Sequence, residues 1–403
     1  MRLFTSLNHR PFALLWSGQS ISLLGDAIYQ VTLAWWVLQK TGSAVIVATV
    51  FIFSFTPMVL FLLLGGVVVD RFPRMQLMLS SDVLRGLVVS VVALLAFTQH
   101  LQVWHIYTAS LLFGFVDAFF QPAYTAAIPE MMPMHLLPSA NSLTSMSANI
   151  TGILGPGLGA FIVLIGGTPL AFALDGLSFF ISAACVAPLV RSSQPSVVDG
   201  EQKHILHDVQ EGIKIVLASP WLWVNIAVAS VTTLTNSAPY FVTMPFLVKE
   251  RLHAGVGTLG FIYSLTAIGS IIAAIWLGRA TRIRHRGFLA FGAYALSGVV
   301  GIAFGLPLPL VVILCVAGLG GAFGSIGELI WTNTLQELVP RDKLGRVSSI
   351  DLLCTRVPLP IGYAIAGVAT QHFGPATVFL VAGSITACVC LLGLAHPAIR
   401  KVE

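Results

Sequence analysis

Long apolar runs alternate with short polar segments along the entire chain. Each run holds about 20 residues, the number that a helix needs to cross the hydrocarbon core of a bilayer. The runs cover residues 12–38, 44–69, 76–98, 104–126, 139–164, 170–190, 221–248, 257–279, 287–305, 309–331, 347–370 and 376–396. This pattern predicts an all-α membrane protein with twelve transmembrane helices.

Composition supports a location within the lipid bilayer. Of the 403 residues 56% are hydrophobic and only 9% are charged, whereas a soluble domain has roughly 25% charged residues. The net charge of +5 comes from small basic groups between apolar runs, so we expect no nucleic-acid partner. The five cysteines lie in apolar runs without C-x-x-C spacing. We therefore expect neither disulfides nor a metal, and no cofactor.

The basic residues also predict the orientation. With the first residues inside, sixteen of the 21 Lys and Arg fall on the cytoplasmic side, and the outside keeps only Lys40, Lys249 and Arg251. Cytoplasmic loops of membrane proteins carry such an excess of positive charge. The sequence thus predicts a multi-pass protein of the cell (inner) membrane with both termini in the cytoplasm.

One long polar connection divides the chain into halves. Residues 191–219 begin with a Ser/Gln/Pro linker and continue with a helical apolar face, including Ile205, Val209 and Ile213. This segment predicts a cytoplasmic linker with an amphipathic helix. A repeat at an offset of 207 residues, with Glu, Pro and Leu recurring after spans 4 and 10, supports two pseudo-symmetric six-helix bundles, 1–190 and 220–403. Such repeats place a substrate site between the halves near the bilayer midplane.

A basic turn joins the second and third runs. It reads Gly66-x-x-x-Asp70-Arg71-x-x-Arg74, with Pro73 inside it. The glycine permits close helix packing, the proline interrupts the helix, and the arginines hold the turn in the cytoplasm. The related turn after span 8 keeps arginines and lacks the acid.

The turn, the six-plus-six arrangement and the long central loop resemble the major facilitator superfamily. Further motifs resemble its drug-exporter branch, which contains macrolide efflux proteins and the enterobactin exporter. These motifs are Gly25-Asp26, Lys40-Thr41-Gly42-Ser43-Ala44, Asp82-Val83-Leu84-Arg85, Ala140-Asn141-Ser142, Asp175-Gly176-Leu177-Ser178-Phe179 and Leu344-Gly345-Arg346-Val347. The resemblance covers the whole chain and implies the major facilitator fold.

The same resemblance implies two elements of conformational gating. One is a relay of Asp70, Arg74 and Glu130, together with Gly66 and Arg71 of the turn, which stabilises the outward-facing state in the family. The other is the antiporter motif of span 5, which includes Gly155, Pro156 and Gly159. In the family this motif suppresses leak and marks export. Thr151 and Ala160 replace two glycines of its usual form.

Acids inside apolar runs are candidates for proton coupling. Asp26 lies in span 1, Asp117 in span 4 and Glu328 in span 10. Charge in the membrane interior costs a few kcal/mol, so such residues mark functional sites. A carboxylate at Asp26 could take up a proton and exchange it for a cationic substrate. A helix-capping role for Asp26 and a pairing of Asp117 with a span 3 residue remain open.

The other charges within spans are expected to find partners. Arg356 in span 11 needs a counter-ion, which Asp351, Glu328 or Asp26 could supply. Asp82 and Arg85 are three residues apart on one helical face, so we expect a structural pair. We expect Asp175 to form interhelical hydrogen bonds.

A pocket for amphipathic molecules combines aromatic walls with a few polar groups. The candidates for substrate binding are Gln19, Tyr29, Gln30, Asn236, Tyr240, Trp331, Asn333 and Arg356.

Motifs for other functions are absent from the sequence. It contains no G-x-x-x-x-G-K-[ST] for a nucleotide-driven pump, no H-E-x-x-H for a zinc enzyme, and Leu23 breaks the G-x-G-D signature of an intramembrane aspartyl protease. We expect no enzymatic activity. The favoured function is proton-coupled export of amphipathic drug-like molecules by a monomer. The alternatives are export of a siderophore or lysolipid and uptake of a metabolite.

Overall fold

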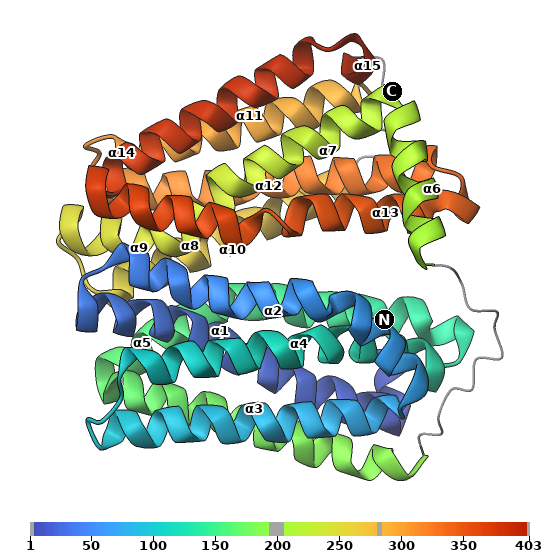
Figure 1. Cartoon of the computed structure of the whole chain (residues 1–403), viewed down its shortest axis with the longest axis vertical. Coiled ribbons are helices and arrows are strands. Elements are labelled where there is room, and N and C mark those ends of the chain that lie inside the picture. Colours follow the sequence, from blue (N-terminus) through green and yellow to red (C-terminus); the bar gives the residue numbers. More distant parts are fainter. Residues whose placement is uncertain (1–3, 193–204, 280–283, 401–403) are drawn as a thin grey trace. The chain divides into compact units, whose positions relative to one another are not determined.

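The computed structural model describes residues 4–192, 205–279 and 284–400. Within these ranges the side chains of residues 62–71, 191–192, 205–209, 211 and 341–342 are not described. Every regular element in the described part of the chain is a helix (Figure 1). Long apolar runs favour helices in a membrane, because a helix satisfies all its backbone hydrogen bonds within one segment.

The helices follow the predicted runs closely. The α-helices before the central linker are α1 (Arg10–Thr41), α2 (Ala44–Arg71), α3 (Arg74–Phe97), α4 (Val103–Met131) and α5 (Leu137–Val186). Those after it are α6 (Ile205–Ala218), α7 (Pro220–Thr232), α8 (Ala238–Val242), α9 (Met244–Phe246), α10 (Val256–Gly278), α11 (Arg286–Gly305), α12 (Leu310–Leu338), α13 (Arg341–Arg356), α14 (Leu359–Ala395) and α15 (Pro397–Arg400). Short 3-10 helices are η1 (Thr5–Asn8), η2 (Met134–Leu136) and η3 (Ala187–Ser192), and π-helical turns are η4 (Thr233–Ser237) and η5 (Leu247–Arg251).

Nine described helices are long and apolar enough to cross a membrane, or ten if the bent pair Gly212–Ala218 and Pro220–Val242 forms one span. Two of them each hold two predicted runs. In α5 the backbone leaves the helix at Gly167, where φ is 72°, and in α14 at Gly374, where φ is 78°. Glycine tolerates these left-handed angles, so each long helix divides at the predicted hairpin. The all-helical, multi-pass membrane fold is confirmed.

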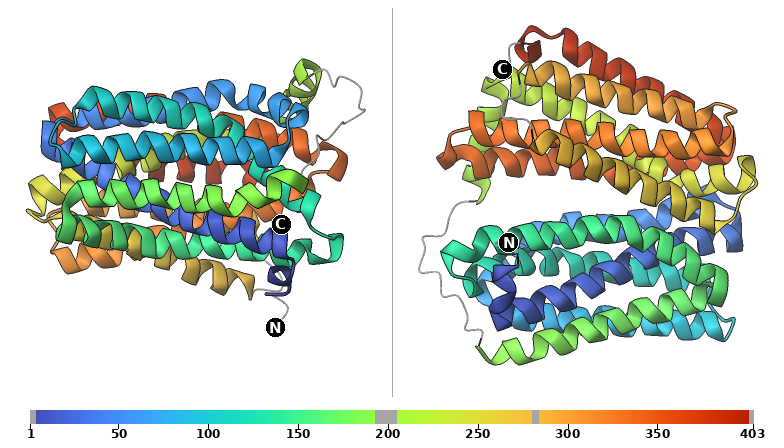
Figure 2. Two further views of the ribbon diagram at one scale, coloured as in Figure 1. Left: turned by 90° about the horizontal axis from the view of Figure 1, so that it is seen from below. Right: turned by 180° about the vertical axis from the view of Figure 1, so that it is seen from behind.

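The chain forms two compact units in which long helices run side by side as bundles (Figures 1 and 2). In unit 1, α5 packs along both α1 and α3, and α3 packs along α4. In unit 2, α11 packs along α12 and α14. Unit 1 comprises Met1–Gly42, Thr49–Asp199 and Gly255–Ser264, and unit 2 comprises Ser43–Ala48, Gly200–Ala254 and Leu265–Glu403.

Small residues set how closely the helices approach within each unit. A Cβ added to Gly155 of α5 would clash with the Cβ of Ala27 in α1. In unit 2, a Cβ on Gly362 of α14 would lie 2.8 Å from Leu234 Cδ2. Both pairs are related by the offset of 207 residues that the sequence shows. The two units therefore repeat the same close helix contact.

Helix α6 packs on α13 of unit 2. Gly212 lies against Ile350 and the Arg346 carbonyl, and Val216 is 5% exposed. Ile213 and Leu217, which the sequence places on the same apolar face as Val216, are exposed at 42% and 66%. The apolar surface of α6 is therefore wider than one docking contact, and its second part faces away from the protein.

Candidate functional site

A cluster of buried charges lies inside unit 1. Asp82 and Arg85 are one helical turn apart on α3, and Arg85 Nη2 donates to Asp82 Oδ1 at 2.7 Å. Asp82 is fully buried and Arg85 is 3% exposed. The expected structural pair is thus present, in an environment where an unpaired charge would cost several kcal/mol.

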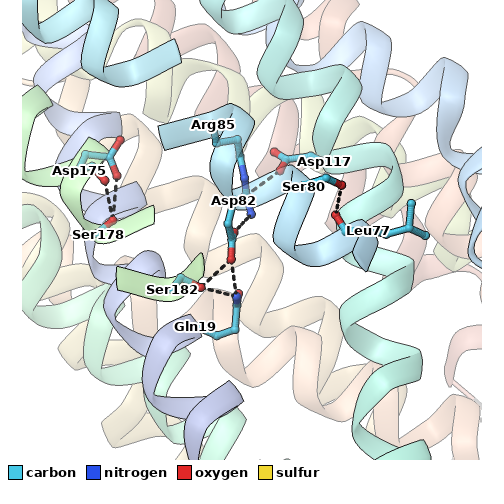
Figure 3. Close-up of polar contacts among 9 residues, drawn as sticks. All are labelled: Gln19, Leu77, Ser80, Asp82, Arg85, Asp117, Asp175, Ser178 and Ser182. Atoms are coloured by element: carbon cyan, nitrogen blue, oxygen red, sulfur yellow. Dashed lines mark hydrogen bonds and ion pairs between the residues drawn. The ribbon is translucent and has the colours of Figure 1, made fainter. Parts of the chain in front are cut away.

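Two further helices complete the coordination of Asp82. Its Oδ2 accepts hydrogen bonds from Ser182 Oγ of α5 at 2.7 Å and from Gln19 Nε2 of α1 at 3.3 Å. Gln19 also donates to Ser182 at 2.8 Å. Figure 3 shows Asp82 between Arg85 on one side and Ser182 and Gln19 on the other. Gln19, a candidate for substrate binding, is 4% exposed and engaged in this network.

Arg85 reaches a second acid. Its Nη1 donates to Asp117 Oδ1 of α4 at 3.2 Å. The guanidinium also lies over the rings of Phe120 and Phe179, 4.0 Å and 4.6 Å from their centroids. Stacking on aromatic faces stabilises a weakly hydrated guanidinium. Asp117, a candidate for proton coupling, therefore adopts the other role left open by the sequence, as the partner of a span 3 residue.

Asp26 has no such partner. Its side chain is partly buried in α1, and within the described part of the chain no hydrogen bond or ion pair joins it to another group. The charges of Arg85, Asp117 and Asp82 act on it at longer range. Asp26 is thus an unpaired acid within electrostatic range of a guanidinium that already binds two other carboxylates.

The hydrogen bonds of Asp175 differ from the expected ones. The sequence predicts interhelical hydrogen bonds for this residue, yet its described bonds come from its own helix α5. Ser178 Oγ donates to the Asp175 carbonyl at 2.7 Å and to Oδ1 at 3.5 Å. Oδ2 is buried without a partner. The reason is that α1 presents Gly25, which has no side chain to donate, at the point of contact.

Unit 2 has a different polar group. Trp331 Nε1 of α12 donates to Asp351 Oδ2 of α13 at 3.2 Å, and the Trp331 ring meets Trp221 edge to face. Glu328, one turn from Trp331, has an exposed side chain. The charges of Glu328 and Asp351 both act on Tyr294 of α11. Unit 2 thus places two acids, one exposed and one partly buried, within electrostatic range of Tyr294.

Neutral hydrogen bonds connect the other helices of unit 2. Asn236 Nδ2 on η4 donates to Ser297 Oγ of α11 at 3.2 Å. Thr235 and Thr386 share a hydrogen bond of 2.6 Å. Asn236, a candidate for substrate binding, sits on a π-helical turn, and such turns are frequent at functional sites.

The remaining substrate candidates differ in exposure. Gln30, Asn333 and Arg356 are exposed, Tyr240 is partly buried beside Phe241, and Tyr29 is 8% exposed. No described acid lies within ion-pair distance of Arg356, so its expected counter-ion stays a prediction.

The gating candidates are placed in part. Arg74 Nη1 donates to Glu130 Oε2 at 3.0 Å and to the Ala126 carbonyl at 2.9 Å, which joins α3 to the end of α4. A Cβ on Gly159 would lie 3.1 Å from Ile28 Cα, so α5 contacts α1 directly beyond Asp26. Pro156 lies between Gly155 and Gly159 in the same stretch of α5. The surroundings of Gly66 and the side chains of Asp70 and Arg71 lie outside the described part of the structure.

Comparison with known proteins identifies the family. The sequence profile of the family described as transmembrane secretion effector matches residues 2–323. The chain belongs to this family of the major facilitator superfamily. Macrolide efflux protein A of Streptococcus pyogenes is 24% identical over 402 residues, covering 97% of this chain and 97% of that protein. The multidrug efflux pump Tap of Mycolicibacterium fortuitum is 25% identical, covering 99% and 98%.

Solved structures show the same fold for this transporter. A bacterial homologue of the iron transporter ferroportin, in an inward-facing state, superposes with a TM-score of 0.73 at 16% identity, covering 96% of this chain and 99% of that chain. The nucleoside transporter NupG gives a TM-score of 0.67 at 12% identity, covering 98% and 100%. The chain is therefore a membrane transporter of the major facilitator fold.

Sequence reasoning missed several residues of the transporter's charge cluster. Ser182, Phe120 and Phe179 look like ordinary residues of apolar spans, and no local signal links them to Arg85. Phe120 lies on α4, and Phe179 and Ser182 lie on α5, so only the packing of these two helices against α3 brings the three residues to Asp82 and Arg85. Within the described residues no group of three or more His, Cys, Asp or Glu side chains is arranged to hold a metal.

Proposed function

We propose that this transporter exports amphipathic, drug-like molecules in exchange for protons. The observation that supports proton exchange is the unpaired acid Asp26 within electrostatic range of Arg85, whose two terminal nitrogens bind Asp82 and Asp117. An intramembrane carboxylate without a counter-ion is stable when it is protonated or faces a cation. Export is supported by the family and by the efflux relatives.

The charge balance around Asp26 suggests competition between two ligands. Asp26 can hold a proton or the positive charge of a substrate, and simultaneous binding of both is unfavourable. Substrate binding from the cytoplasm then displaces the proton, and proton binding from the outside displaces the substrate. Glu328, an acid of unit 2 with an exposed side chain, is a second candidate for this exchange.

Alternating access supplies the movement. In this proposal residues 1–190 rock against residues 220–403, with both termini in the cytoplasm and one chain acting alone. The Arg74–Glu130 ion pair of 3.0 Å, together with Asp70, acts as a latch for one state. The close contact of Gly155 and Gly159 with α1 couples helix packing to the region of Asp26.

Groups that remain accessible on the protein are the proposed substrate contacts. Gln30, Asn333 and Arg356 have exposed side chains, while Trp331 and Asn236 are partly buried. Tyr240 adds an aromatic wall with a hydroxyl group that bonds Thr266. Aromatic faces with a few polar groups suit large amphipathic molecules.

Transport into inverted membrane vesicles tests the proposal. We expect vesicles with the wild-type protein to accumulate the macrolide erythromycin when their interior is made acidic. The Asp26→Asn variant should lose this gradient-driven accumulation, because the amide cannot exchange a proton. Glu250→Gln is the matched control, since Glu250 is an exposed acid on η5 and should transport like the wild type.

Two results would contradict the proposal. One is accumulation that does not depend on the pH gradient, and the other is normal gradient-driven transport by Asp26→Asn. A parallel panel with a cationic dye, a ferric siderophore and a lysolipid separates drug export from the alternative substrates. Transport of the siderophore alone would replace the drug-like substrate class.

A further inference from the structure

Asp175 is a fully buried acid that the proposed mechanism leaves unused. Its relative exposure is 0%. Oδ1 receives one long hydrogen bond of 3.5 Å from Ser178, and Oδ2 has no described partner. A bare carboxylate in this position would cost several kcal/mol. The geometry therefore requires that something neutralise the group.

Helix packing brings Asp175 to the backbone of the proposed coupling residue. A Cβ added to Gly25 would lie 2.5 Å from Asp175 Oδ1 and would clash with Ser178 Oγ. Gly25 directly precedes Asp26, so the Asp175 carboxyl lies against the helical turn that carries Asp26. The charge of Asp26 acts on Asp175. Two acids that are 149 positions apart in sequence thus belong to one contact region between α1 and α5.

A second unpartnered group belongs to the same place. Tyr29, one turn after Asp26, is 8% exposed, and its hydroxyl has no described hydrogen-bond partner. The ring is held by stacking on Phe113 and by contact with Phe172. The charges of Asp175 and Asp26 both act on this side chain. A hydroxyl can donate to one carboxyl and accept from another.

The nearby positive charge is already in use. The charge of Arg85 on α3 acts on Asp175 at long range, while the terminal nitrogens of Arg85 bind Asp82 and Asp117. Next to Gly176, the residue that follows Asp175, α3 contributes Gly86 and Ser90. The groups that face Asp175 from α1 are Asp26 and Tyr29. One arginine therefore serves a region with four acids, and Asp26 and Asp175 lack a cationic partner.

We propose that Asp175 and Asp26, together with the unpartnered hydroxyl of Tyr29, form one proton-binding site in which Asp175 holds the exchanged proton. The proton leaves Asp175 as H⁺ through Asp26 when substrate binds, and no other bond is made or broken. This inference rests on the proposed proton exchange. It adds a second carrier, on the second half of α5, to the acid that the sequence singles out.

Infrared difference spectroscopy tests the site without transport. Purified protein in detergent is titrated in pH, and the stretching band of protonated carboxyl groups is followed. We expect Asp175→Asn to lose one wild-type carboxyl band and to shift the titration of the remaining band of Asp26. Asp26→Asn should shift the band of Asp175 in turn. The Glu250→Gln control should leave both unchanged. An Asp175→Asn spectrum identical to that of the wild type overturns the proposal.

Vesicle transport then distinguishes a failure of the role of Asp175 from a failure of the proposed proton-coupled export. Asparagine mimics the protonated acid, so we expect Asp175→Asn to lose uphill, gradient-driven erythromycin transport and to retain exchange of labelled for unlabelled erythromycin. Normal uphill transport by this variant overturns the role of Asp175 while leaving Asp26 as the coupling residue. Gradient-independent transport by the wild type would instead overturn the proposed function.

A second variant guards against misfolding. Tyr29→Phe removes only the hydroxyl and keeps the stacked ring, so the variant should fold. We expect it to retain both carboxyl bands and to shift the titration of the Asp175 band, because a polar group of the site is lost. A titration identical to that of the wild type would overturn the place of Tyr29 in the site.

Discussion

Helices α3 and α11 occupy equivalent places in the two units and begin in the same way. Arg74 opens α3 and pairs with Glu130 at the end of α4, at 3.0 Å. Arg286 opens α11 and pairs with Glu337 at the end of α12, at 2.6 Å. The same ion pair therefore fixes the same end of each bundle.

The helix interiors then diverge. Eight and eleven residues after its first arginine, α3 carries Asp82 and Arg85, whereas α11 carries Tyr294 and Ser297. Ser297 Oγ donates to the Tyr294 carbonyl at 2.7 Å. A charged pair in unit 1 thus corresponds to a neutral pair in unit 2, on helices that pack alike.

At a second matched contact the acid is in unit 2 and the neutral group is in unit 1. In unit 2, Trp331 donates to the charged Asp351. At the positions 207 residues earlier, Tyr124 hydrogen-bonds the neutral Thr144. The repeat keeps the contact and changes its charge. The two bundles share packing geometry and the ion pair at one end. At the two matched contacts inside the bundles one unit has a charged group where the other has neutral groups, so the units can perform different chemistry on one scaffold.

The largest effect should come from removing the charge at one of the matched positions. We expect Arg85→Gln to destabilise the protein by about 3–5 kcal/mol, because Asp82 is left buried and Asp117 loses its cation. Ser297→Ala, the matched change in unit 2, should cost about 1 kcal/mol. Thermal melting in detergent micelles measures both. Equal losses for the two variants would contradict the difference between the units.

An intermediate effect should come from helix spacing. We expect Gly155→Ala to destabilise the protein by about 1–3 kcal/mol, because its Cβ clashes with Ala27 and one bundle must repack. Gly324→Ala in unit 2 meets nothing within 4 Å and should be neutral or gain up to about 1 kcal/mol from helix propensity. The same melting assay decides. Tolerance of Gly155→Ala would mean that α1 and α5 separate freely.

The smallest effect on stability should come from the shared ion pairs. Glu130→Gln and Glu337→Gln each remove a partly exposed pair, which contributes about 0.2–1 kcal/mol and weakens with salt. Asp70 is present in the first basic turn and has no counterpart in the second. If the latch needs this acid, Glu130→Gln should slow erythromycin transport in vesicles and Glu337→Gln should not. Equal slowing by both would show that the two turns act alike.

The sequence alone determined the framework of this transporter. Helix length and apolar character are local properties, so the apolar runs locate the spans, and Gly167 and Gly374 fall between the predicted runs. The repeat at 207 residues and the basic turn likewise need only residue identity and spacing. From the same information Asp82 and Arg85 could be paired, since they lie one turn apart on one helix.

Only the tertiary structure decided which charges find partners. Asp117 lies 32 residues from Arg85 and contacts it, whereas Asp26 stays unpaired within electrostatic range of the same guanidinium. Asp175 lost its expected partner because Gly25 faces it, and Arg356 proved exposed. These outcomes depend on how each helix is rotated about its axis against its neighbours. Small residues such as Gly25 and Gly155 set that rotation through close packing, which no local pattern in the sequence encodes.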